Sequence, residues 1–155
     1  MNSKSLLSGA ALALALATVP GLRAEDVDFQ KQVLPIFEKH CFECHQAPRY
    51  DDTGRLKKPK SGLRMDNPEL LLEGGDGTDA DGGETGVALT PGDPDKSTIY
   101  TFMMLADDHE YVMPPEKKDR MTAEEKEVVK QWIAQGAKVG DWKGAPKEVT
   151  PTPPQ

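Results

Sequence analysis

The most chemically distinctive residues of this sequence lie between His40 and Gln46, in the stretch HCFECHQ. It contains both cysteines of the chain, Cys41 and Cys44, and two of its three histidines. Two thiols separated by two residues can form a redox-active dithiol, half of a metal site, a disulfide or the anchor of a covalent cofactor. The neighbouring residues distinguish among these chemistries.

Three of these chemistries leave part of the pattern unexplained. A thioredoxin-like dithiol opens a helix after a strand, whereas these cysteines end a helical pattern that no strand pattern precedes. A structural zinc ion needs four ligands, and a second ligand pair at the usual spacing is missing. A disulfide across two residues removes little chain entropy and leaves His45 without a role.

Covalent haem attachment accounts for the whole C-x-x-C-H pattern. The thiols of Cys41 and Cys44 would add to the two haem vinyl groups as thioethers, and the imidazole of His45 would bind the iron from the same side. We therefore expect one covalently bound haem c per chain, with His45 as an iron ligand.

A second iron ligand has to come from elsewhere in the chain. The candidates after residue 24 are Met65, Met103, Met104, Met113, Met121, His40 and His109. Met103 and Met104 fall in a helical pattern that is typical of core packing. Two prolines follow Met113 and stiffen its loop, which lowers the entropy lost when the sulfur binds iron. We favour Met113, partly for this stiffness and partly for the family resemblance given below, with His109 or an open site as alternatives.

Amphipathic helices should position these groups. The first begins at Asp28, a candidate N-cap, and carries apolar residues at helical spacing up to Cys41, with Pro35 as an irregularity that bends it or delays its start. The last covers residues 121–137, where Thr122 and Glu125 form a capping box. A short helix after residue 95 or 97 should contribute a second set of apolar side chains to the core. We find no alternating strand pattern, so the expected fold class is all-α.

The segments between these helices are rich in glycine, proline and charge. The acidic stretch EGGDGTDADGGETG, residues 73–86, imitates a calcium-binding repeat. Asp81 stands where such a repeat requires an apolar residue, and the chain has one copy where stacking requires several. A solvated loop is therefore favoured, with cation binding left open. The proline-rich residues 143–155 are expected to be a disordered tail.

The first 24 residues have the pattern of a secretory signal peptide. Lys4 precedes an apolar run, and small Ala24 marks the expected cleavage point. Cleavage would remove two positive charges and change the formal charge of −7 to −9. We expect an exported, soluble and acidic product, in the bacterial periplasm or an equivalent location. Its acidity disfavours nucleic acid or an anionic membrane as a partner and allows docking on a basic protein face.

Several stretches, read in order, match one known pattern. They are VLPIFEKHCFECH (33–45), SGLRMD (61–66), LLEGGDG (71–77), PGDPDKSTIY (91–100), VMPP (112–115) and MTAEEKEVVKQWIAQGA (121–137). With these stretches the chain resembles the planctomycete-type cytochrome c domain, a branch of the class I c-type cytochromes. Gln46 departs from the glycine that the family often has, and the stretch TDADGGETG lengthens the loop before PGDP.

The resemblance implies a domain over residues 25–142 with a small all-α cytochrome c fold. Its first and last helices would cross around one haem held by Cys41, Cys44, His45 and Met113, with long loops between them. The expected function is that of an electron carrier with a redox partner protein, and not of an enzyme. The alternative is a haem enzyme subunit or a gas-binding sensor with an open distal site.

Overall fold

The computed structural model describes residues 25–75 and 87–153 of the chain. The expected signal peptide at residues 1–24 lies outside the described residues, and so does most of the acidic loop in which a cation site was considered. Within the two described ranges, no helix is both long enough and apolar enough to cross a membrane.

The expected first helix is present and irregular. A π-helical turn, η1 (Phe29–Val33), continues directly into α1 (Leu34–His40). Asp28 is confirmed as the N-cap, because its carboxylate accepts the Lys31 N–H at 3.1 Å. Pro35 has no N–H to donate to the preceding turn, so the widened turn lies just before it. The helix therefore reaches Cys41 with Phe29, Val33 and Phe37 buried.

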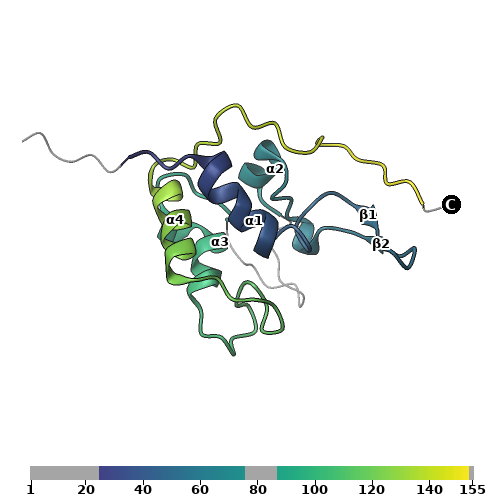
Figure 1. The fold of residues 1–155 in the computed structure, drawn as a ribbon, viewed down its shortest axis with the longest axis horizontal. Helices are drawn as coiled ribbons and strands as arrows, with labels where there is room; N and C mark the ends of the chain where they lie inside the picture. The colour runs from purple at the N-terminus through teal and green to yellow at the C-terminus, as the bar shows by residue number, and fades with distance from the viewer. Residues whose placement is uncertain (1–24, 76–86, 154–155) are drawn as a thin grey trace, which may run out of the picture.

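The last helix, α4 (Ala123–Ala134), packs against this first segment. The predicted capping box of Thr122 and Glu125 is confirmed, with both reciprocal hydrogen bonds present. The ring of Trp132 lies 5.3 Å from that of Phe29 and 5.6 Å from that of Phe37, measured between centroids. Figure 1 shows α1 and α4 side by side at the centre of the fold. The Phe37 and Trp132 rings meet edge-on, at 81°, and such packing adds to the gain from burying apolar surface.

Between these helices, the described residues form seven shorter elements. In order they are β1 (Arg49–Tyr50), β2 (Leu56–Lys57), η2 (Lys60–Gly62), α2 (Pro68–Glu73), η3 (Pro94–Lys96), α3 (Thr98–Thr101) and η4 (Phe102–Met104). The second set of apolar core side chains comes from α3 and η4, which contribute Ile99, Tyr100 and Met103.

The prediction of an all-α fold class is wrong, because β1 and β2 form an antiparallel pair in register Arg49↔Lys57 and Tyr50↔Leu56. The turn between them is built on Asp51, whose carboxylate accepts hydrogen bonds from the Thr53 hydroxyl and the Arg55 N–H. The Thr53 hydroxyl contributes most to holding the pKa of Asp51 well below its usual value. The fold is thus mixed. Strands of two residues are too short to show an alternating pattern in the sequence.

The prediction that Met103 and Met104 both pack in the core is half wrong. Met103 is buried, at 3% exposure, but the side chain of Met104 is 54% exposed. After Thr101 the chain tightens from an α-helix into the 3-10 turn η4. A 3-10 turn has about 3 residues instead of 3.6, so neighbouring positions shift around the axis and Met104 faces outward.

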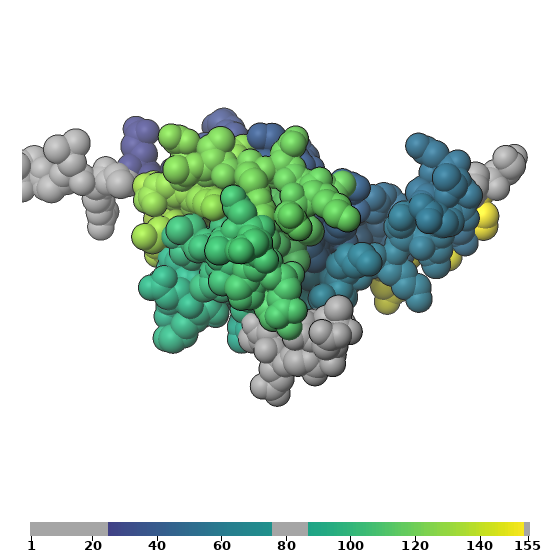
Figure 2. All heavy atoms as spheres, turned by 90° about the horizontal axis from the view of Figure 1, so that it is seen from below, coloured from purple at the N-terminus to yellow at the C-terminus, as the bar shows by residue number. Residues whose placement is uncertain are grey.

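The tail expected to be disordered is described as far as residue 153 and begins with defined contacts. The Ala145 N–H donates to the Asp66 carbonyl at 2.7 Å, and Lys147 pairs with Glu73 at the end of α2. Figure 1 shows the tail in yellow, running from α4 past α2 toward the β1–β2 pair. In Figure 2 the blue segment that contains this pair stands out from the body of the molecule, with the described end of the tail beside it.

Candidate functional site

The C-x-x-C-H residues form one turn that continues directly from α1. The Cys41 N–H donates to the Phe37 carbonyl at 2.8 Å, and the His45 N–H donates to the Cys41 carbonyl at 2.9 Å. Cys41 also packs against the core beside Phe42. The structure therefore brings Cys41, Cys44 and His45 together on one turn, which we call the attachment turn (residues 41–45).

A second segment, residues 60–66, lies along the attachment turn and is bonded to it through the backbone. The Lys60 N–H donates to the Cys44 carbonyl at 2.9 Å, and the Met65 N–H donates to the His45 carbonyl at 2.8 Å. The chain just after α2 packs tightly against this segment, because a side chain at Gly75 would collide with the Ser61 carbonyl. The attachment turn is thus held from two sides, by α1 and by residues 60–66.

The two cysteines of the attachment turn are free thiols. Burial, with a smaller effect from the nearby Cys44, raises the pKa of Cys41 to about 12. A thiol with so high a pKa is neutral at pH 7, whereas dithiol exchange requires a thiolate. The geometry therefore gives no support to a redox dithiol and leaves both sulfur atoms available for thioether bonds.

His45 has an unusual environment for a buried histidine. Burial lowers its pKa, while backbone groups of Lys60 and Leu63 act in the opposite direction. Its Nδ1 atom is buried and has no hydrogen-bond partner among the described residues. A neutral imidazole with a ring nitrogen left unpartnered fits a metal ligand, because buried polar atoms are otherwise almost always satisfied.

Within the described parts of the chain, no three His, Cys, Asp or Glu side chains gather in a way that could hold a metal ion. A haem iron does not need such a cluster, since the porphyrin nitrogens supply most of its ligands. The attachment turn provides what a haem c requires on one side, namely two thiols and one imidazole. The residues present therefore fit this group.

Met113 lies on a separate loop, residues 106–118. Its N–H donates to the Phe102 carbonyl at 3.0 Å, and its side chain is half-buried. It does not belong to the hydrophobic core, whereas Met65, Met103 and Met121 do. Among the described methionines only Met113 is thus neither packed in the core nor largely exposed.

The Met113 loop is held by hydrogen bonds from Arg120, and its end lies next to the attachment turn. The guanidinium of Arg120 donates to the Pro114 carbonyl and, at 2.7 Å, to the Asp107 carbonyl. Lys118 forms an ion pair of 2.6 Å with Glu43, which stands between the two cysteines. The loop and the turn are therefore neighbours, although no hydrogen bond among the described residues joins Met113 to His45 directly.

The other candidate ligands have different surroundings. The side chain of His40 is engaged on both ring nitrogens, at 3.2 Å from the Asp119 carbonyl and 3.2 Å from the Glu125 carboxylate. His109 is exposed, and its Nδ1 accepts the Tyr111 N–H at 3.1 Å. His40 is thus a link between the end of α1 and the start of α4.

Sequence reasoning missed two buried residues next to the site, Arg64 and Asp66. Both are 6% exposed, and the carboxylate of Asp66 accepts the Ala47 N–H at 2.8 Å, two residues after His45. A charged residue in a polar loop carries no local sign of burial. The stretch SGLRMD, which was noted only as supporting the family resemblance, was the available signal.

A C-x-x-C-H turn at the end of a helix, held by a second backbone segment and by the packing of the first and last helices, is the arrangement expected of a c-type cytochrome domain. The comparison with known families agrees and is more specific: residues 41–117 match the family model described as Planctomycete cytochrome C. The chain contains a cytochrome c domain of this planctomycete type. The matched stretch includes the attachment turn and Met113, while α1 and α4 lie outside it. No curated protein and no solved structure matches the chain.

Proposed function

We propose that this protein is an exported electron carrier with a single covalent haem c, whose iron is bound by His45 and Met113. The observation that carries the proposal is the buried, unpartnered Nδ1 of His45 on the same turn as two free thiols. Cytochrome c domains act in electron transfer, and among the described residues the histidine next to the attachment turn, His40, is engaged by Glu125.

Each residue of the site would have a distinct role. Bound haem supplies an iron that alternates between Fe(III) and Fe(II) and so takes up and releases one electron. Cys41 and Cys44 would hold the ring by covalent bonds, and neutral His45 would donate a nitrogen lone pair. Met113 would approach from its stiff loop, and its soft sulfur would favour Fe(II) and raise the potential. The core around Phe37 and Trp132 would exclude water from the anchored side.

Export and partner choice complete the proposal. The signal pattern of residues 1–24 supports transport to the periplasm, where haem c is attached in bacteria. The expected formal charge of the processed chain is −9, because cleavage removes Lys4 and Arg23 from a chain of −7. Such a charge favours a redox partner with a basic docking face and disfavours nucleic acid.

Mass spectrometry of protein made in a host that matures haem c tests the proposal. We expect the mass of the chain from residue 25 plus one haem that survives acid extraction. A ferric spectrum with the far-red methionine–iron charge-transfer band, and a reversible one-electron titration, would support the carrier. A bare polypeptide mass would refute haem attachment, and a high-spin ferric spectrum would favour an enzyme or gas sensor with an open site.

A further inference from the structure

A buried ion pair joins Arg64 and Asp66 beside the attachment turn. The Arg64 Nε donates to Asp66 Oδ1 at 2.6 Å and Nη2 donates to Oδ2 at 3.2 Å, with side-chain exposures of only 7% and 9%. A buried ion pair repays its desolvation only when the remaining donors and acceptors are also bonded. The other hydrogen bonds of this pair therefore show which segments hold it in place.

The remaining donors of Arg64 are bonded to the C-terminal segment. Nη1 donates to the Lys147 carbonyl at 3.2 Å, and Nη2 donates to the Pro146 carbonyl at 3.1 Å. The Ala145 N–H donates to the Asp66 carbonyl at 2.7 Å. We call residues 144–147 the C-terminal strap. It lies beyond the residues matched by the family model, which end at position 117.

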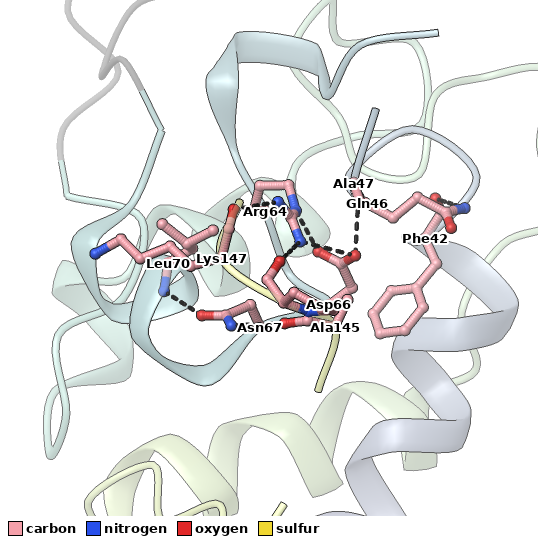
Figure 3. Close-up of polar contacts among 10 residues, drawn as sticks. Phe42, Gln46, Ala47, Arg64, Asp66, Asn67, Leu70, Ala145 and Lys147 are labelled. Atoms are coloured by element: carbon pink, nitrogen blue, oxygen red, sulfur yellow. Dashed lines mark hydrogen bonds and ion pairs between the residues drawn. The ribbon is translucent and has the colours of Figure 1, made fainter. Parts of the chain in front are cut away.

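On its other side, the same ion pair contacts the backbone just after the attachment turn. Asp66 Oδ2 accepts the N–H of Ala47, and the adjacent Met65 N–H donates to the His45 carbonyl. Figure 3 shows Arg64 between the strap and Asp66, with Asp66 reaching Ala47. The strap, the ion pair and the backbone around His45 thus form one bonded series.

From this series we infer that Asp66 is a positioning residue for His45, and that the C-terminal strap holds it in place through Arg64. The strap fixes the Arg64–Asp66 pair, which fixes the backbone that follows His45. The inference rests on the proposed haem function only where it concerns the iron. The positioning of the backbone can be measured independently of the haem.

Two glycines provide a matched test. Gly144 and Gly140 have nearly the same φ, +62° and +64°, so an alanine meets a similar left-handed φ at either position. At Gly144 the added methyl would overlap the Asp66 carbonyl oxygen and lie 3.0 Å from the Asn67 Cα. At Gly140 it would meet nothing within 4 Å. Only the first substitution should push the strap away from Asp66.

The experiment compares wild type, Gly144→Ala and Gly140→Ala as holoproteins, by amide hydrogen exchange, reduction potential and optical spectrum. In Gly144→Ala we expect the Ala47 and Met65 amides to exchange roughly fivefold faster or more, as for a hydrogen bond weakened by about 1 kcal/mol. The potential should fall, because water reaching the His45 side favours Fe(III). The methionine–iron band should persist, since Met113 is untouched. Gly140→Ala should match wild type in all three measurements.

A chain that ends at Lys143 removes the strap without adding a methyl group, and it should reproduce the effects of Gly144→Ala even if that variant fails to fold. Unchanged exchange at Ala47 and Met65 in the shortened chain would overturn the inference. Equal effects of the two glycine substitutions would also overturn it. Failure of the proposed function would look different, because the wild-type mass would then lack haem while the exchange comparison still decided the role of the strap.

Discussion

The two sides of the proposed haem site are held in different ways. The attachment turn continues from a helix whose residues are buried against Trp132, and residues 60–66 bond to its backbone. Met113 itself lies outside the main hydrophobic cluster, and its loop is held by a few contacts, which are the Met113–Phe102 backbone hydrogen bond, the stacking of Tyr111 on Phe102 and the hydrogen bonds of Arg120. The anchored side is therefore formed by the polypeptide itself, whereas the methionine side would gain part of its order from the proposed bond to iron. Disturbing each side separately should give different kinds of effect.

Loss of a core methionine should have the largest effect on stability. We expect Met103→Ala to lower the free energy of unfolding by about 2–5 kcal/mol, because Met103 is 3% exposed and its removal leaves a cavity. The neighbouring Met104→Ala should change it by no more than about 0.5 kcal/mol, because Met104 is 54% exposed. Chemical denaturation of the two holoproteins measures both values, and equal losses would show that the burial of the pair is misassigned.

Loss of the proposed iron ligand should change the iron more than the fold. Met113→Ala should leave the haem attached, because Cys41 and Cys44 would hold it independently, and should convert the iron to a high-spin or water-bound state. The potential should fall by something on the order of a hundred millivolts or more, in line with the range that axial ligands span. Optical spectra and redox titration measure this, with Met104→Ala as the control that keeps the wild-type spectrum. If Met113→Ala keeps the low-spin methionine spectrum, the ligand is another residue.

The contrast between the two sides also explains how much the sequence could predict. The Thr122–Glu125 capping box acts over a few residues, and its prediction from local spacing is confirmed. The C-x-x-C-H pattern is equally local, and the structure places its three residues on one turn, while haem attachment stays a prediction. The hydrogen bond from Arg64 to the Lys147 carbonyl joins positions 83 residues apart. No local pattern encodes such a contact, because both residues look like ordinary surface charges. The β1–β2 pair and the outward turn of Met104 were missed because two-residue strands and a single 3-10 turn leave no periodic signal.

The hydrogen bonds from Arg120 that hold the Met113 loop can be removed without changing Met113. Arg120→Ala removes the donors to the Pro114 and Asp107 carbonyls and should destabilise the holoprotein by about 1–2 kcal/mol. Hydrogen exchange over residues 106–118 should accelerate, while exchange over residues 41–47 stays as in wild type. Lys118→Ala is the matched control, because its ion pair with Glu43 is exposed and such pairs contribute about 0–1 kcal/mol. Equal acceleration on both sides would mean that the loop and the turn form one unit.

The smallest expected effect is the pH dependence of the stability that Glu125 provides where the end of α1 meets the start of α4. Burial acts to raise the pKa of Glu125, but the Thr122 N–H, Lys39 and His40 together lower it below its usual value. A carboxylate whose pKa is lower in the folded state stabilises the fold above its unfolded pKa of about 4.3, and this contribution disappears as the pH falls through the folded pKa.

Glu125→Gln keeps a residue suited to the capping box but loses the charge that faces Lys39 and His40. At pH 7 we expect the variant to be less stable than wild type by about 1 kcal/mol or less, since Lys39 is largely exposed and its pair with Glu125 is screened by solvent. Thermal unfolding of both proteins between pH 7 and pH 3 should show the two melting temperatures converging below about pH 4. A difference that stayed constant over this range would mean that Glu125 stabilises the helix junction through its shape and hydrogen bonds, and that its charge contributes nothing.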